Sequence, residues 1–180
     1  TKNLDFIKRN LSNEIDLGKV ILTNLNKENL TIKDYNKLLT SKSFWNSIPG
    51  ENILIFQTDT CLCSHSKYSI DKYLNYDYVG APWKKMTWNP PKVGGNGGFS
   101  FRKKSAMLGA LDKPVSSNED GYFSSKNLNY PSKELAKTFS AETIFYDKPY
   151  GVHKPWNYLN KKELDILRKN CPEIKTIFGK

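Results

Sequence analysis

Apolar and polar positions along the chain alternate between the spacing of helices and that of strands. Apolar residues recur at helical spacing in 4–11 (LDFIKRNL), in 31–48 and in 161–171. Residues 19–25 (KVILTNL) are apolar and β-branched, which predicts a strand. The continuous apolar run at 53–56 (ILIF) is typical of a buried strand in a parallel sheet.

The rest of the chain continues this alternation of short elements. The pattern predicts strands at 76–83, 97–101 and 141–146, and helices at 69–74 and 102–111. Strands and helices that alternate in this way indicate an α/β fold with a mostly parallel sheet flanked by helices. No apolar run approaches the roughly 20 residues that span a bilayer. Because no signal peptide opens the chain either, we expect no membrane span and a cytoplasmic protein.

The chain has 180 residues, the size of one domain, and is strongly basic. It carries 28 Lys and Arg against 18 Asp and Glu, a net charge of +10. Such a charge attracts polyanions, which include nucleic acid, anionic membranes and phosphate-bearing small molecules. The lysines are spread along the whole chain, however, so the excess also fits an ordinary solvated surface.

The three cysteines, Cys61, Cys63 and Cys171, are an odd number, which argues against a disulfide framework. His65 lies close to the first two in CLCSH, but a second ligand pair is missing, so the spacing does not support a zinc site. We therefore expect buried, reduced thiols, which suit a reducing compartment.

Two acidic positions stand where a functional site would form. Asp59 lies three positions after the end of the run 53–56, and ligands of open α/β sheets gather at the carboxyl ends of strands. A carboxylate there can hold a hard cation such as Mg²⁺, or it can simply cap a turn. Glu119 and Asp120 follow Asn118 in the first turn of a predicted helix, where the helix dipole favours carboxylates. The functional alternative is that one of them faces a cleft and acts as a general base.

A glycine string and a loop histidine complete the candidate chemistry. VGGNGGFSF at 93–101 places four glycines around Asn96. Glycine loses more backbone entropy on folding than any other residue, so the string indicates that something bulky lies against bare backbone. It is not a phosphate-binding loop, because no Gly-Lys-Ser/Thr ending follows. His153, in YGVHKPW, can serve the structure or reach a metal or a phosphate.

Five stretches taken together resemble a known family. ILIFQTDTCLC, YDYVGAPW, GGNGGFSFRKKSAML, NEDGYFS and YGVHKPW occur in this order within residues 31–156. They are similar to a family catalogued as a domain of unknown function in microbes and viruses, which itself resembles GT-A glycosyltransferases. The resemblance implies a GT-A-like catalytic domain at 1–160 and a helical tail at 161–180. It also implies that the family's first strand and nucleotide-binding segment would lie before residue 1.

The resemblance further implies roles for single residues. QTDT stands where GT-A enzymes carry an Asp-X-Asp motif, so Asp59 would bind Mn²⁺ or Mg²⁺ and, through the ion, the diphosphate. The first acid of that motif is replaced by Gln57, and His153 would complete the metal shell. Glu119 and Asp120 resemble the acidic pair of inverting transferases, in which Asp120 is the favoured base and Glu119 the second candidate.

The glycine string would lie under the sugars of donor and acceptor, by the same resemblance. Gly95, Asn96, Gly97 and Gly98 would let the backbone approach a pyranose closely and offer N–H groups to it. Further residues expected at sugar or phosphate are Trp83, Trp88, Trp156, Lys84, Lys85, Lys103 and Lys154. Each tryptophan can equally be a core residue.

The function that follows is a metal-dependent glycosyltransferase that moves a sugar from a nucleotide-sugar donor to a hydroxyl acceptor, with inversion. The acceptor can be a glycan, a protein or a small molecule. One alternative is a basic nucleic-acid-binding module, supported by the net charge and by aromatic residues near lysines. No recognised motif supports it, so nucleic acid is the less favoured partner. The other alternative, in view of Gln57, is a catalytically inactive sugar-binding domain.

Overall fold

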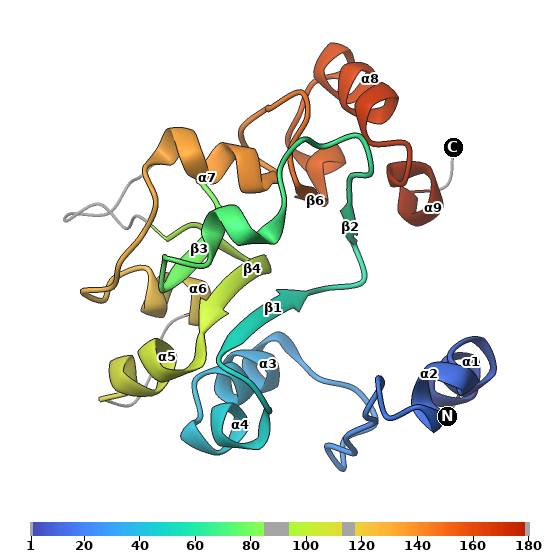
Figure 1. Cartoon of the computed structure of the whole chain (residues 1–180), viewed down its shortest axis with the longest axis vertical. Coiled ribbons are helices and arrows are strands. Elements are labelled where there is room, and N and C mark those ends of the chain that lie inside the picture. Colours follow the sequence, from blue (N-terminus) through green and yellow to red (C-terminus); the bar gives the residue numbers. More distant parts are fainter. Residues whose placement is uncertain (1, 85–93, 113–117, 179–180) are drawn as a thin grey trace. The chain divides into compact units, whose positions relative to one another are not determined.

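A computed structural model describes residues 2–84, 94–112 and 118–178, and the chain divides into two compact units, Thr1–Thr31 and Ile32–Lys180 (Figure 1). The first unit holds α1 (Lys2–Asn10), as the sequence predicts, and α2 (Ser12–Asp16). The strand predicted at 19–25 is wrong, because these residues form no strand and Ile21 is 72% exposed. A β-branched run becomes a strand only where another strand supplies its hydrogen bonds.

The second unit carries the remaining elements. In chain order they are α3 (Ile32–Leu39), α4 (Lys42–Ser47), β1 (Asn52–Phe56), β2 (Thr60–Leu62), η1 (Ile70–Tyr73), β3 (Tyr78–Ala81), β4 (Asn96–Lys103), α5 (Lys104–Ala110), α6 (Glu119–Phe123), α7 (Lys133–Phe139), β5 (Ser140–Ala141), β6 (Gly151–His153), η2 (Pro155–Asn157), α8 (Lys161–Asn170) and α9 (Ile174–Phe178).

The helix expected over 31–48 is two helices, α3 and α4. The Ser41 hydroxyl accepts a hydrogen bond from the Phe44 N–H and so caps the start of α4. Trp45 is fully buried, and its indole N–H donates to the Leu39 carbonyl across the break, at 2.8 Å. The turn between the helices therefore places a large aromatic side chain in the core.

Two small sheets form the framework, with strand orders β1-β4-β3 and β2-β6-β5. The prediction of a mostly parallel sheet is wrong, since β5–β6 is the one parallel pair among the described strands. β4 returns between β1 and β3 and is antiparallel to both. The apolar run of β1 indicates a strand, but it does not show whether the neighbouring strand runs parallel or antiparallel to it. β1 pairs only with β4 in this sheet, and its Phe56 is 69% exposed.

The sheet of β1, β4 and β3 separates two aromatic cores. On one face, Phe99 and Phe101 of β4 pack with Tyr73 and Phe139. On the other face, Trp45, Tyr78 and Phe123 form a cluster that also includes Met107 of α5. Figure 1 shows α3, α4 and α5 near one end of β1 and β4, and α7 beside β3. β4 is therefore the central strand on which both cores are built.

The C-terminal helices pack onto the second sheet. Leu167 of α8 and Ile174 of α9 are buried in one cluster with Ala141 and Val152. α8 begins at Lys161, where the helical tail was expected, and carries a capping box between Asn160 and Glu163. Residues 161–178 thus share a core with β5 and β6.

The expectation of three reduced thiols is wrong. Cys63, next to β2, forms a disulfide with Cys171 at the end of α8, and Cys61 is the free cysteine. Cys61 and Cys63 are two residues apart on an extended segment and so face the same side. The Sγ atom of Cys61 lies 4.0 Å from that of Cys171, and burial raises the pKa of its thiol to about 12. The number of cysteines in the sequence does not show which two form a disulfide. Here the two partners, Cys63 and Cys171, lie 108 positions apart, and only the fold brings them together.

Among the described residues, no helix is both long and apolar enough to cross a membrane.

Loss of the disulfide should lower the stability of the folded chain. The bond closes a loop of 108 residues, and such a cross-link restricts the unfolded chain. We expect Cys63→Ser to reduce the free energy of unfolding, measured by urea denaturation, by about 2–5 kcal/mol. Cys61→Ala is the matched control, with an expected loss of about 1 kcal/mol or less. Three thiols titrated in the unreduced, unfolded chain, instead of one, would contradict the bond.

Candidate functional site

Asp59 and His153 are brought together by the pairing of β2 with β6. In this antiparallel ladder Thr60 lies opposite His153. The Lys154 N–H, one residue further, donates to the Asp59 carbonyl at 3.0 Å. Lys154 adopts a left-handed backbone conformation, with φ 35°, which is uncommon for a residue other than glycine. The pairing therefore brings Asp59 close to His153, although more than 90 positions separate the two residues in the sequence.

The His153 ring lies between two carboxylates. Its Nε2 atom is 3.3 Å from Asp59 Oδ1 and 3.2 Å from Gln57 Oε1. Its Nδ1 atom is 3.3 Å from Oε1 of Glu142, which directly follows β5. The His153 and Glu142 side chains are each 1% exposed, whereas the Asp59 side chain is 36% exposed. The ring therefore presents one nitrogen to the protein interior and the other to a partly open edge.

The side chains on the open edge fit the donor set of a divalent cation. Neighbouring ligand atoms around an octahedral Mg²⁺ ion are about 3 Å apart, which follows from its bond lengths of 2.0–2.1 Å. Asp59 Oδ1 and Gln57 Oε1 lie close to that spacing from His153 Nε2. Asp59 Oδ1 is also a buried oxygen without a hydrogen-bond donor among the described residues. Glu142 stands where a carboxylate commonly orients a metal-binding histidine.

The described residues hold no group of three or more His, Cys, Asp or Glu side chains arranged as metal ligands. The candidate set is two such residues, Asp59 and His153, with the neutral amide oxygen of Gln57. An ion held there would take its remaining ligands from water or from a bound phosphate, as Mg²⁺ usually does.

The glycines of β4 make room for the chain's own side chains. A Cβ atom on Gly98 would overlap the His153 ring, and one on Gly97 would overlap the Glu119 carboxylate and the Arg102 guanidinium. This confirms that bulky groups lie against the bare backbone, and here they belong to the protein. Both glycines are buried, as is Gly95, so Asn96 is the partly exposed residue of the string.

Glu119 forms a buried ion pair with Arg102. The guanidinium donates to both carboxylate oxygens, at 2.5 and 3.0 Å, and the two side chains are 4% and 0% exposed. Burial raises the pKa of the Glu119 carboxyl, and Arg102 offsets part of that effect. The Asn36 side-chain oxygen also accepts the Glu119 backbone N–H, at 2.8 Å. Both oxygens of Glu119 are thus engaged inside the protein.

Asp120 is the more accessible of the two acids. Its side chain accepts a hydrogen bond from the Asn96 amide at 3.5 Å. The oxygen of the same amide accepts the Gly98 N–H at 2.8 Å, which fixes Asn96 against the start of β4. Asp120 is partly exposed, so it fits the role of a base better than Glu119 does.

Three polar residues of this region carry no role in the sequence prediction. Glu142 follows a strand, as Asp59 does, and this position is the signal that could have identified it. Arg102 could not be identified in this way, because it lies within β4 and nothing in the sequence distinguishes it from other strand residues. Tyr35 of α3 is half-buried near Gln57 and Glu119. Burial raises the pKa of its hydroxyl, and the neighbouring Gln57 side chain offsets part of that effect.

The remaining predicted residues are more scattered. Trp83 is half-buried after β3, and Trp156 packs on the cluster formed by β5, β6 and α8. Lys154 is half-buried and joins the site through its backbone. Trp88 and Lys85 lie outside the described residues. The structure therefore brings together the predicted side chains of Asp59 and His153, and those of Asn96 and Asp120.

Comparison with known proteins identifies a family for most of the chain. A model of the family described as Protein of unknown function (DUF5672) matches residues 19–153, three quarters of the chain. No curated protein and no solved structure matches the sequence or the fold.

Substitution of Glu119 should destabilise the fold more than substitution of its neighbour Asp120. Glu119→Gln leaves the buried Arg102 guanidinium uncompensated, so we expect a loss of about 3–5 kcal/mol in the free energy of unfolding. Asp120→Asn is the matched control, with an expected change of about 1 kcal/mol or less. Urea denaturation measures both. Equal losses for the two variants would show that Glu119 is not the structural member of the pair.

Proposed function

This chain belongs to the DUF5672 family, and we propose that it is a metal-dependent glycosyltransferase that moves a sugar from a nucleotide-sugar donor to a hydroxyl acceptor. One observation carries the proposal. Asp59, which precedes β2, and His153 of β6 place an oxygen and a nitrogen 3.3 Å apart at a partly open edge, with Glu142 behind the ring. This is an arrangement in which two side chains can bind one cation.

Asp59, His153 and Gln57 would hold Mn²⁺ or Mg²⁺. Such an ion supplies positive charge that stabilises a departing nucleoside diphosphate. Glu142 Oε1, 3.3 Å from Nδ1, would orient the His153 ring so that Nε2 faces the open edge. Because Gln57 is neutral, Asp59 is the one carboxylate within the donor set. The protein would therefore bind the cation weakly alone and more tightly together with a diphosphate.

Asp120 would take the proton from the acceptor hydroxyl. A general base must lie within hydrogen-bonding reach of that proton and keep a defined orientation. Asn96 supplies the orientation, because its amide links Asp120 to the Gly98 backbone. A deprotonated hydroxyl that attacks the sugar from the face opposite the diphosphate inverts the anomeric centre. Inversion is thus part of the proposal.

Binding of the donor should depend on both the cation and Asp59. We expect at least one nucleoside diphosphate or nucleotide sugar, with Mn²⁺, to raise the melting temperature. A ligand at 100 times its dissociation constant adds about 2.7 kcal/mol of stability. Asp59→Ala and His153→Ala should abolish this shift, whereas Asp71→Ala, at an exposed acid on η1, should keep it. A shift that survives in Asp59→Ala, or that does not need the cation, would contradict the proposed donor site.

Transfer should depend on Asp120 separately from binding. We expect Asp120→Asn to keep the Mn²⁺-dependent thermal shift and to slow release of nucleoside diphosphate by about 10²–10⁴-fold, the usual contribution of a general base. Asp147→Asn, at another exposed acid, is the matched control and should react as the unmodified chain does. Undiminished transfer by Asp120→Asn would remove Asp120 from the base role. Donor binding without any transfer by the unmodified chain would instead favour a sugar-binding domain.

A further inference from the structure

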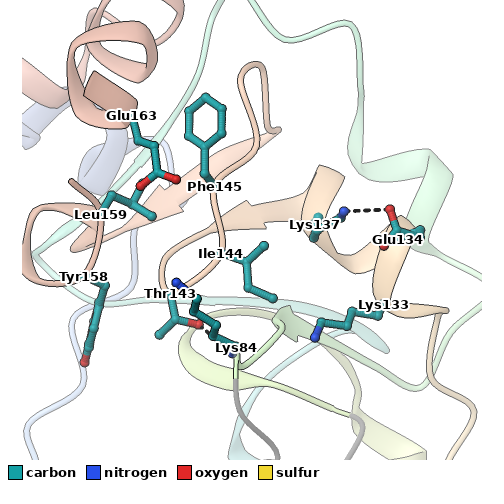
Figure 2. A pocket seen from close by; sticks show the side chains of 10 residues that line it. All are labelled: Lys84, Lys133, Glu134, Lys137, Thr143, Ile144, Phe145, Tyr158, Leu159 and Glu163. Carbon is teal, nitrogen blue, oxygen red and sulfur yellow. Dashed lines mark hydrogen bonds and ion pairs between the residues drawn. The ribbon is translucent and has the colours of Figure 1, made fainter. Parts of the chain in front are cut away.

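A pocket separate from the candidate site opens between α7, the segment after β5 and the start of α8 (Figure 2). Its volume is about 520 Å³, within the range of small-molecule sites. Lys84, Lys133 and Lys137 line it, with Thr143 and Ile144. Neither His153 nor Glu142 lines it, and both are buried at the neighbouring site. The pocket is thus a second place at which a ligand can bind.

Thr143 fixes the wall that carries Lys84. Its hydroxyl donates to the Pro82 carbonyl and accepts the Lys84 backbone N–H, both at 3.1 Å. These two bonds join the end of β3 to the end of β5, so the Lys84 backbone is held in place. Figure 2 shows Lys133 extending from α7 toward the wall that carries Lys84 and Thr143. Two ammonium groups therefore belong to one pocket, although 49 positions separate them in the sequence.

The charges of this pocket are not balanced. Lys137 pairs with Glu134 at 2.6 Å, and Glu163 accepts the Asn160 N–H in the cap of α8. No ion pair involves Lys84 or Lys133 among the described residues. Both lysines are exposed. The lining has three lysines against two glutamates, so it keeps a net positive charge, and Lys84 and Lys133 can both contact a dianionic group.

Apart from Glu163, the remaining walls of the pocket are apolar or aromatic. Phe145 is half-buried, and Leu159 is buried in the same cluster as Leu167 and Ile174. Ile144 lies between Lys84 and Lys133 in the view of Figure 2, and Tyr158 adds a ring that is 52% exposed. Surfaces of this kind accept carbon atoms rather than a bare ion.

We propose that this pocket binds a small phosphate monoester, with Lys84 and Lys133 on the phosphate and Ile144, Phe145 and Tyr158 against its organic part. A monoester carries a charge of about −1.5 to −2 at neutral pH, which matches two ammonium groups. A carboxylate has half that charge and fewer acceptor oxygens. The size of the pocket and its apolar walls favour a small molecule over a nucleic-acid strand. The inference goes beyond the proposed sugar transfer and does not depend on it.

The test is a titration of the full chain with phenyl phosphate, without metal or nucleotide, followed by calorimetry at low ionic strength. We expect a dissociation constant of about 1 mM or lower. Lys84→Met and Lys133→Met should each weaken binding by about tenfold, because each removes one charged partner. Lys42→Met is the matched control, since it removes an exposed lysine on α4, and should leave the constant unchanged. Benzoate, which has the same ring and a single charge, should bind at least about tenfold more weakly.

Several results would overturn the inference. They are no binding by the unmodified chain up to about 10 mM, equal losses in all three lysine variants, and equal binding of benzoate. A nucleoside diphosphate with Mn²⁺ serves as a competitor. If it displaces phenyl phosphate, the pocket is part of the donor site and the inference of a separate site is wrong. Failure of sugar transfer would leave the result of this titration unaffected.

Discussion

The guanidinium of Arg102 is fully buried beneath the central sheet and forms two hydrogen bonds with the Glu119 carboxylate. It also lies over the Tyr78 ring, 4.7 Å from its centroid. A buried charge without a partner is strongly destabilising, so β4, which carries Arg102, and α6, which carries Glu119, must keep one geometry. Because Asp120 is the next residue of α6, the same ion pair decides where the candidate base lies.

β4 couples this ion pair to the candidate metal ligands. Gly97 faces the pair and Gly98 faces the His153 ring. β4 also bulges here, since its register with β3 shifts between Gly80 and Ala81. Bulges commonly occur next to sites, where they redirect side chains. Two adjacent glycines thus let a structural ion pair and a candidate catalytic histidine approach one strand from both sides.

Much of the local structure and part of the site can be predicted from the sequence. The spacing of apolar residues locates β1, β3, β4, α5 and α8. This spacing depends only on which side of a short segment is buried, so it can be recognised from neighbouring residues alone. The carboxyl end of β1 points to Asp59, and the glycine string points to close packing around Asn96. The choice between Glu119 and Asp120 is not available from sequence, because both fall in the first turn of α6. Their burial and their partners distinguish them, since Glu119 is paired with Arg102 inside the protein and Asp120 is partly exposed.

The sequence by itself determined where most elements lie, the basic charge of the chain and the acidic and histidine residues that are candidates for a site. The tertiary structure decided the antiparallel course of β4, the disulfide of Cys63 with Cys171, and the placing of Glu142 behind His153. These features pair residues that lie from 11 to 108 positions apart. Hydrophobic periodicity reports only whether a residue is buried. Its partner depends on how whole elements pack, and that is settled only when the chain has folded.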